Sequence, residues 1–276
     1  MRSAVLGHVE WMTFGLVDRV PASGEIAHSL DWWEEPGGGG AVAAVQLQRL
    51  TGDCTFFTAL GRDAVGERAH LELEGLGLRV RVARRPAQTR RGFTFIEASG
   101  ERTITTLGER LHVRADDPLP WDELADVDCV YVCAADAGAL RRARGARVVV
   151  ATSRMAGLLA EAAVRLDAVV GSASDPRETF DPADLPERPA LVVRTEGRQG
   201  GTFETAEGSV GRYAAAEPPG PIVDTYGAGD TFAAGLAFAL GRGDDVEGAL
   251  SVAARCAAWC VAGRGPYGRS LTAEDV

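Results

Sequence analysis

Short apolar runs alternate along this chain with longer Ala- and Leu-rich segments whose apolar positions recur at helical spacing. Strands that are apolar throughout and lie between helices are typical of a parallel sheet covered on both faces. The pattern therefore predicts one α/β domain over residues 1–276, with three α/β/α layers around a mostly parallel sheet. The predicted strands are Ser3–Leu6, Thr55–Ala59, Cys129–Cys133, Arg147–Ala151, Ala168–Val170 and Leu191–Arg194. The predicted helices are Ala41–Leu50, Gly66–Leu76, Met155–Arg165, Thr231–Leu240 and Val246–Val261.

Two early segments do not follow this alternation of strands and helices. Residues Glu10–Glu35 are polar, aromatic and turn-rich, without helical periodicity. Residues Val80–Ile104 contain alternating stretches such as RGFTFIEASGERTIT, which suit an antiparallel hairpin exposed on one face. We expect the two segments, about 10–35 and 80–104, to form a small β-lid on the domain. Two ordinary surface excursions explain the pattern equally well.

Composition excludes several classes of protein. A chain of 276 residues with 46% hydrophobic content can bury one large core, and its net charge of −10 disfavours nucleic acid as a partner. No apolar run reaches the roughly 18–20 residues that cross a bilayer, so we expect no membrane span. The N-terminal sequence MRSAVLGHVE is predicted as a strand and lacks the features of a secretory signal, which makes a cytoplasmic location the default.

Cysteine usage leaves two interpretations open. The chain has five cysteines, at 54, 129, 133, 256 and 260, and an odd number argues against a disulfide framework. Two Cys-x3-Cys pairs permit a zinc site. Both pairs lie in apolar strand-like or helical runs, where cysteine acts as a small buried hydrophobe. Core packing is the favoured interpretation.

The stretch PPGPIVDTYGAGDTFAAGLAFAL, residues 218–240, carries the strongest chemical signal. Small residues precede a long apolar helix, so free backbone N–H groups at the helix start can hold an anion. Phosphoryl transfer needs such a site and a carboxylate beside the acceptor hydroxyl, and Asp230 stands at that position. The alternative role of Asp230 is a simple helix cap, which requires no glycine cradle.

These residues resemble the pfkB (ribokinase-like) family of carbohydrate kinases. Asp224-Thr225-x-Gly227-Ala228-Gly229-Asp230 matches the family's C-terminal signature, and GGGGAVAAVQLQRL from Gly37 is similar to its N-terminal glycine motif. Further similar stretches are Gly61-x-Asp63-x-x-Gly66, the sequence GERTIT, and Thr195-Glu196-Gly197 followed by Gly200-Gly201.

The resemblance implies an ATP-dependent kinase that uses Mg²⁺ and transfers the γ-phosphoryl group to a hydroxyl of a sugar or sugar-like acceptor. It implies that Asp230 is the general base and that Gly227, Ala228 and Gly229 form the anion hole. It also implies a monovalent cation such as K⁺ near Asp224, and a homodimer that pairs through the lid. The implied nucleotide contacts are Thr195, Gly197, Gly200 and Thr225, and the implied acceptor contacts include Gly38 and Gly39.

The sequence departs from the family pattern in places, as a chain without any Lys or Asn must. The family's Asn-x-x-Glu motif corresponds to Ser172-x-x-Asp175, where Asp175 still suits a hydrated Mg²⁺. Positions that contact sugar hydroxyls in several members correspond to Val42 and Met12, which favours an acceptor with an apolar portion. His8, Glu10 and Asp18 are candidates for the remaining polar contacts. Arg154 is a further candidate ligand, because it follows a predicted strand end.

Three other functions compete with a sugar kinase. A nucleoside kinase on the same fold suits the apolar residues at positions 12 and 42. A catalytically weak nucleotide- or sugar-sensing protein suits the altered Ser172 motif, although the intact Asp230 opposes it. A dinucleotide-binding enzyme is suggested by Gly263-x-Gly265-x-x-Gly268, but that motif lies too near the end of the chain for the helix and strand that it requires.

Overall fold

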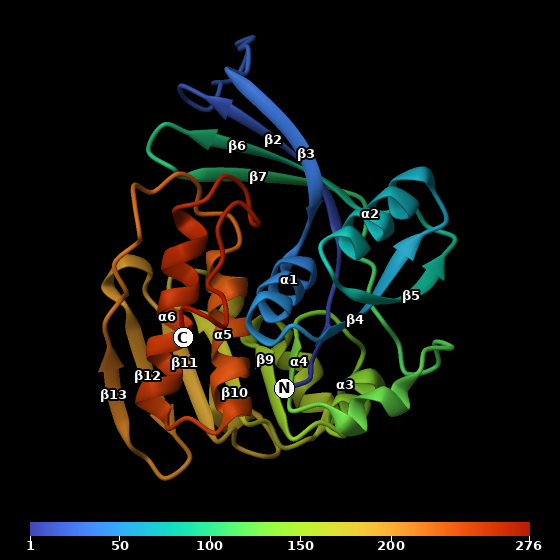
Figure 1. The fold of residues 1–276 in the computed structure, drawn as a ribbon, viewed down its shortest axis with the longest axis vertical. Coiled ribbons are helices and arrows are strands. Elements are labelled where there is room, and N and C mark those ends of the chain that lie inside the picture. Colours follow the sequence, from blue (N-terminus) through green and yellow to red (C-terminus); the bar gives the residue numbers. More distant parts are fainter.

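A nine-stranded sheet, in the order β13-β12-β11-β10-β9-β8-β1-β4-β5, forms the centre of the computed structural model, which describes all residues 1–276 (Figure 1). The strands from β11 to β5 in this order are all parallel, and β12 and β13 add an antiparallel edge. The predicted α/β class with a mostly parallel sheet is confirmed. The bounds are β1 (Ser3–Leu6), β4 (Cys54–Gly61), β5 (Arg79–Arg85), β8 (Cys129–Val132), β9 (Val148–Thr152), β10 (Ala168–Ser172), β11 (Leu191–Thr195), β12 (Gly201–Thr205) and β13 (Val210–Tyr213).

Helices cover both faces of this sheet and give the three predicted layers. Side chains of α1 (Gly39–Thr51), α2 (Ala64–Gly75), α5 (Ala228–Arg242) and α6 (Val246–Val261) share one core of 39 buried residues. On the opposite face, α3 (Ala137–Ala143) and α4 (Ala156–Ala162) belong to a second core of 22 buried residues. The short 3-10 helices are η1 (Trp121–Asp126), η2 (Ser153–Met155), η3 (Pro176–Glu178), η4 (Pro182–Asp184) and η5 (Gly197–Gln199).

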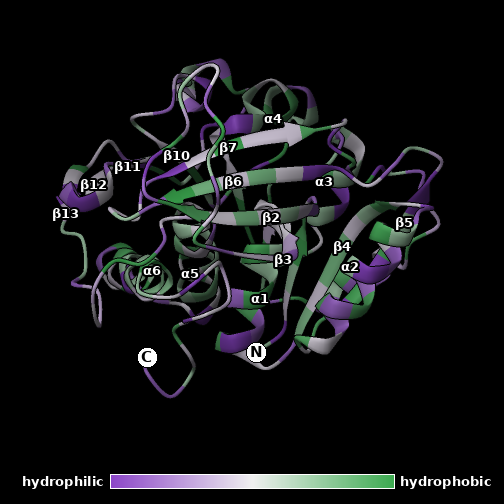
Figure 2. Ribbon diagram, turned by 90° about the horizontal axis from the view of Figure 1, so that it is seen from above, coloured by the Kyte–Doolittle hydropathy of each residue, from purple (hydrophilic) through white to green (hydrophobic).

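A second sheet of four strands extends across one end of the domain, as expected for a lid (Figures 1 and 2). Figure 2 looks down on this lid sheet, whose order is β3-β2-β6-β7. Its central pair, β2 and β6, is parallel, so the two early segments of the chain are joined by backbone hydrogen bonds. The strands are β2 (Glu10–Val17), β3 (Asp31–Gly37), β6 (Arg91–Glu97) and β7 (Arg102–Leu107).

One predicted boundary of the lid is wrong. We expected the second lid segment to begin at Val80, but residues 79–85 form β5, which pairs in parallel with β4 at the edge of the large sheet. Its mixed pattern has a different cause: Val80 packs into the larger core, and Ala83 packs with Ala59 and Leu111 in a separate small cluster. Polar side chains alternate with apolar ones in this edge strand as they do in a hairpin, so the sequence pattern alone did not separate the two.

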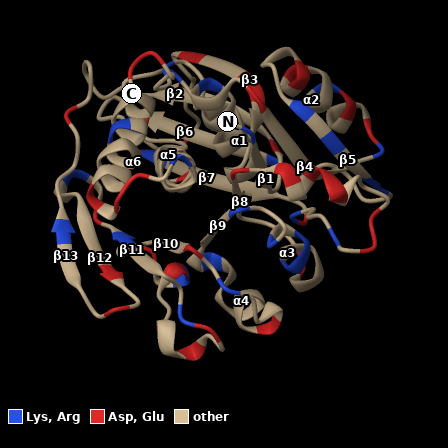
Figure 3. Ribbon diagram, turned by 60° about the horizontal axis from the view of Figure 1, so that its bottom comes forward, with Lys and Arg blue, Asp and Glu red and all other residues tan.

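The cysteines have the core-packing role. All five are free and buried, and Cys54, Cys129, Cys133 and Cys256 belong to the larger core. No helix of the structure combines the length and apolar content that a membrane span requires. Acidic and basic residues are interspersed over the elements (Figure 3).

Candidate active site

The glycine-rich loop before α5 has the geometry of an anion-binding helix start. Gly227 has φ 84°, a left-handed conformation that side chains rarely adopt, and α5 begins directly after it at Ala228. Gly229 and Asp230 therefore lie in the first turn, where backbone N–H groups have no partner within the helix. Asp230 does not cap the helix, because the N-cap position belongs to Gly227 and no side chain bonds to the free N–H groups. The simple capping role is wrong.

Asp230 faces the N-terminal glycine motif. A Cβ atom added at Gly39 would lie 3.1 Å from Asp230 Cγ and closer still to Oδ1, so the carboxylate occupies the space that a side chain there would fill. Burial raises the pKa of Asp230 to about 6, and the negative charge of Glu178 acts in the same direction. The positive charges of Arg102 and Arg154 partly oppose that rise. A carboxylate with this pKa is ionised at neutral pH and is basic enough to accept a proton.

The two glycine motifs are tied together by Tyr226. Its phenol oxygen accepts a hydrogen bond of 2.8 Å from the backbone N–H of Gly38, the N-cap residue of α1. Val42, one turn into α1, packs against the anion loop, since a Cβ atom at Gly227 would lie 2.8 Å from its Cγ1. The start of α1 and the start of α5 are therefore held in a fixed relation around Asp230.

Val42 and Met12 are not placed to contact an acceptor. Their exposed fractions are 1% and 0%, and both belong to a small cluster with Phe14, Ile96 and Tyr226 between the lid and the anion loop. The prediction of an apolar acceptor surface at these two positions is therefore wrong, because the two side chains are used to pack the lid onto the domain. Asp18 lies exposed beyond the end of β2, away from this junction.

Arg154 and Asp175 lie together with a residue that the sequence analysis missed. The Arg154 guanidinium donates hydrogen bonds to Asp175 (2.6 Å) and to Glu178 (2.5 Å). Glu178 also accepts a bond of 2.6 Å from the backbone N–H of Ser172, at the end of β10. The signal for Glu178 was present as a second carboxylate three residues after Asp175, one turn beyond the motif that we compared. The site thus contains two carboxylates where the family pattern led us to expect one.

The predicted nucleotide loop lies beside this group. Thr195 ends β11, and its carbonyl accepts a bond of 2.9 Å from Ala173 in the loop that carries Asp175. Gly197 and Gly200, both with positive φ, lead into the reversal toward β12. Gly197 is exposed, whereas Gly200 is buried in the reversal. The loops after β10 and β11 thus share the carboxyl edge of the sheet, where ligands gather in α/β folds.

Thr225 connects the site to the lid. Its hydroxyl and its backbone N–H both donate to the Gly100 carbonyl, at 3.1 and 3.2 Å. Arg102 of β7 donates to the same hydroxyl at 3.1 Å. The hydroxyl is therefore engaged by the β6–β7 turn, in place of the nucleotide contact that we predicted.

Asp224 has the features of a cation ligand. Its exposed fraction is 1%, and its Oδ1 accepts a 2.8 Å bond from the Tyr226 N–H. Its Oδ2 is buried without a hydrogen-bond partner, and burial raises the pKa of the carboxyl group. An unpaired buried carboxylate oxygen is costly unless a cation or proton compensates it. The residue fits the predicted monovalent-cation site.

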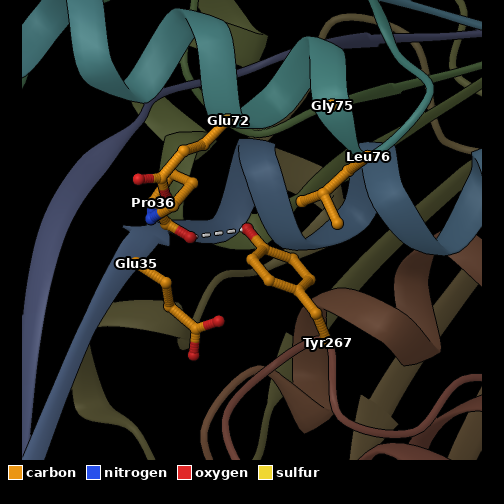
Figure 4. Close-up of a pocket in the computed structure, with 6 residues that line it drawn as sticks. All are labelled: Glu35, Pro36, Glu72, Gly75, Leu76 and Tyr267. Carbon is orange, nitrogen blue, oxygen red and sulfur yellow. Dashed lines mark hydrogen bonds between the residues drawn. The ribbon is translucent and has the colours of Figure 1, made fainter.

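A cleft of about 380 Å³ lies between α2, β3 and the C-terminal segment (Figure 4). The Tyr267 hydroxyl crosses it to donate a 2.7 Å bond to the Pro36 carbonyl. Its other lining residues are Glu35, Glu72, Gly75 and Leu76. None of the predicted site residues lines this cleft, so we do not assign the acceptor to it.

Comparison with known proteins agrees with this geometry. The sequence profile described as pfkB family carbohydrate kinase matches residues 2–273. The chain is 29% identical to the ATP-dependent ribose-1-phosphate kinase of Halopiger xanaduensis over 98% of its own length and 95% of the relative. It is 41% identical to the ribokinase of Bacillus subtilis, over 32% of its length and 29% of that relative. A microbiome-derived acarbose kinase has the same fold, with a TM-score of 0.83, 22% identity, and coverage of 99% of this chain and 96% of that one.

Proposed function

Because this chain belongs to the pfkB family of carbohydrate kinases, we propose that it transfers the γ-phosphoryl group of ATP to a hydroxyl of a sugar-type acceptor. The observation that carries the proposal is Asp230, whose pKa is raised to about 6 and which lies between the glycine loop of α5 and Gly39. This is the placement of a general base beside an anion-binding helix start.

Asp230 and the loop before α5 have different roles in the transfer. The Asp230 carboxylate accepts the acceptor hydroxyl proton as the acceptor oxygen forms its bond to phosphorus. The bond between the γ-phosphorus and the bridging oxygen of ATP breaks, and ADP leaves with that oxygen. The N–H groups that follow Gly227 stabilise the charge on the phosphoryl group in flight.

Thr195, Gly197 and Gly200 are the proposed nucleotide contacts, since their loop borders the carboxylate-bearing loop after β10. Asp175 and Glu178 are the proposed holders of magnesium. Hard oxygen ligands suit a hydrated Mg²⁺, and the ion neutralises nucleotide phosphate charge when bound. Arg154 now bonds to both carboxylates, so a metal ion and this guanidinium compete for them.

Asp224 is the proposed ligand of a monovalent cation such as K⁺. Its unpartnered Oδ2 supports this assignment, because a cation removes the cost of burying that oxygen. A cation held there would offset the charge of the buried Asp224 carboxylate and would stabilise the residues before Gly227.

The acceptor is proposed to be a carbohydrate. The family description favours it over the nucleoside and sensor alternatives, and the burial of Val42 and Met12 removes the main argument for a nucleoside. Relatives are named for a free sugar, a sugar phosphate and an oligosaccharide derivative, so the family alone leaves the kind of sugar open.

We also propose a cytoplasmic homodimer that pairs through the lid. Strand β7 is an exposed edge of the lid sheet, and exposed strand edges recruit partners. Ile104, Leu107 and Trp32 present apolar surface on the lid, with exposed fractions of 40%, 60% and 64%. Five unpaired cysteines suit a reducing compartment, which is also where ATP is held.

Release of ADP across a panel of sugars tests the function. Asp230→Asn is expected to lower kcat by about 10²–10⁴-fold while ATP affinity changes little, because the amide keeps the shape of the side chain and loses its basicity. Asp184→Asn, at an exposed aspartate in η4, is the matched control and should match the wild type. Turnover by Asp230→Asn within about tenfold of the wild type contradicts the proposal.

A further inference from the structure

A group of charged and polar side chains between the glycine motif and the lid has no role in the chemistry described above. His8 follows β1, and its Nε2 accepts a 3.4 Å bond from the Gly39 N–H. Glu10 begins β2, and its carboxylate lies 3.3 Å from Arg90. Because Gly39 also borders Asp230, these residues adjoin the carboxylate that faces the acceptor hydroxyl.

Two buried donors in this group have no partner. His8 Nδ1 and Arg90 Nε make no hydrogen bond, and the two side chains are only 10% and 15% exposed. Since Nε2 of His8 accepts the Gly39 bond, the neutral imidazole carries its proton on Nδ1. Both unpartnered atoms are therefore N–H donors. Buried donors of this kind are costly unless a ligand accepts from them.

Arg110 adds a positive charge to this group, because it acts on both His8 and Glu10. It lies exposed just after β7, in a segment that passes Arg90, since a Cβ atom added at Gly108 would lie 4.0 Å from the Arg90 Cα atom. Arg110 forms no ion pair, whereas Arg90 is paired with Glu10. After burial, the charge of Arg110 is the largest cause that lowers the pKa of His8, which places it within electrostatic reach of the imidazole. We name His8, Arg90 and Arg110 the donor pocket.

We propose that the acceptor sugar carries an anionic group, a phosphate or a carboxylate, which the donor pocket holds while a hydroxyl faces Asp230. This inference rests on the proposed kinase function and narrows its substrate class. The donor pocket offers N–H groups and positive charge, and the neighbouring carboxylate of Glu10 is already paired with Arg90. A sugar hydroxyl both donates and accepts, so an all-donor set suits it poorly. A phosphate or carboxylate only accepts, and charge-assisted bonds from arginine to such groups are the strong ones.

Matched acceptor pairs test the inference in the ADP-release assay. The pairs are ribose against ribose 1-phosphate, ribose against ribose 5-phosphate, and ribose against ribonate, which separates a phosphate from a carboxylate. At least one anionic member is expected to have a kcat/KM about tenfold or more above that of ribose. Calorimetric titration of the same compounds without ATP should show the same order of affinity.

Substitution of the pocket gives the second readout. Arg110→Gln is expected to lower kcat/KM for the preferred anionic acceptor by about ten- to a hundredfold and to change that for ribose less than about threefold. Arg110→Lys should restore part of the loss. Arg165→Gln, at an exposed arginine before β10, is the control and should leave both acceptors unchanged.

The outcomes for the two proposals differ. If ribose is phosphorylated and bound as well as every anionic partner, or if Arg110→Gln affects both members of a pair equally, the anionic acceptor is refuted and the kinase function stands. If no sugar of the broad panel releases ADP, the kinase function fails. Tighter binding of the anionic members in calorimetry then still supports the donor pocket, and equal binding overturns it.

Discussion

Position 39 must lack a side chain if the Asp230 carboxylate is to keep its position beside the glycine motif. An added Cβ atom would lie within 3.0 Å of the Asp230 carboxylate, and ordinary van der Waals contact begins at 3.4 Å. The carboxylate must therefore move by at least 0.4 Å, the difference between these two distances. Misplacement of a catalytic group by about 1 Å can cost on the order of 10²-fold in rate. Gly39→Ala is expected to lower kcat by about ten- to a hundredfold.

The fold should tolerate this change, because Gly39 is the first residue of α1 and does not have positive φ. Alanine is a better helix former than glycine by about 1 kcal/mol, so the melting temperature should not fall. The assay is steady-state ADP release, with ATP affinity and thermal unfolding measured on the same samples. Gly157→Ala in α4 is the matched control, since its added Cβ atom would meet nothing within 4 Å.

A kcat of Gly39→Ala within about threefold of the wild type would refute the fixed position of Asp230. A loss of activity that comes with an equal loss of ATP affinity or of thermal stability would refute it too. Either result would show that Asp230 is not held against the glycine motif during catalysis.

Three further predictions follow from the site. Because the pKa of Asp230 is raised to about 6 and only the carboxylate accepts a proton, kcat/KM should be level above pH 6 and fall about tenfold per unit below it; a profile that stays level to pH 4.5 contradicts this. Asp224→Asn should abolish stimulation by K⁺, measured against a non-binding organic cation, and K⁺ stimulation equal to that of the wild type would remove Asp224 from the cation site. The protein should sediment as a dimer at micromolar concentration, and Ile104→Asp with Leu107→Asp should sediment as a monomer; a monomeric wild type would refute lid pairing.

Much of the fold was predictable because its strands are short, apolar on both faces and separated by helices. Strand β1 and helix α6 begin and end where the pattern placed them. The lid was harder to predict. Strand β2 is buried along most of its length although its sequence, EWMTFGLV, mixes aromatic and polar residues. Its burial comes from pairing with β3 and β6, which is a contact between distant segments that no local pattern records.

The geometry of the site was predictable where a motif requires one backbone conformation, as at Gly227 before the helix that carries Asp230. It was less predictable where several side chains share a task. Glu178 acts with Asp175 on Arg154, and this grouping depends on the turn of η3 and on the end of β9 lying beside that of β10. The sequence motif from Ser172 to Asp175 records neither that turn nor that pairing of strands. Sequence comparison located the loop and missed that Glu178 shares Arg154 with Asp175.

Val42 and Met12 show a more general limit. An apolar residue at a position where the family pattern has a polar one has two opposite interpretations. It either changes the acceptor site, or it packs the lid against the domain and does not contact the acceptor. The deciding partner is Tyr226, whose ring makes an edge-on contact with Phe14 of the lid at 5.1 Å and whose hydroxyl holds Gly38. Because the lid packs on this ring, the apolar side chains around it are buried in the junction and are not available to an acceptor. The unpartnered donors of His8 and Arg90 therefore support a proposal about the acceptor better than the apolar substitutions do.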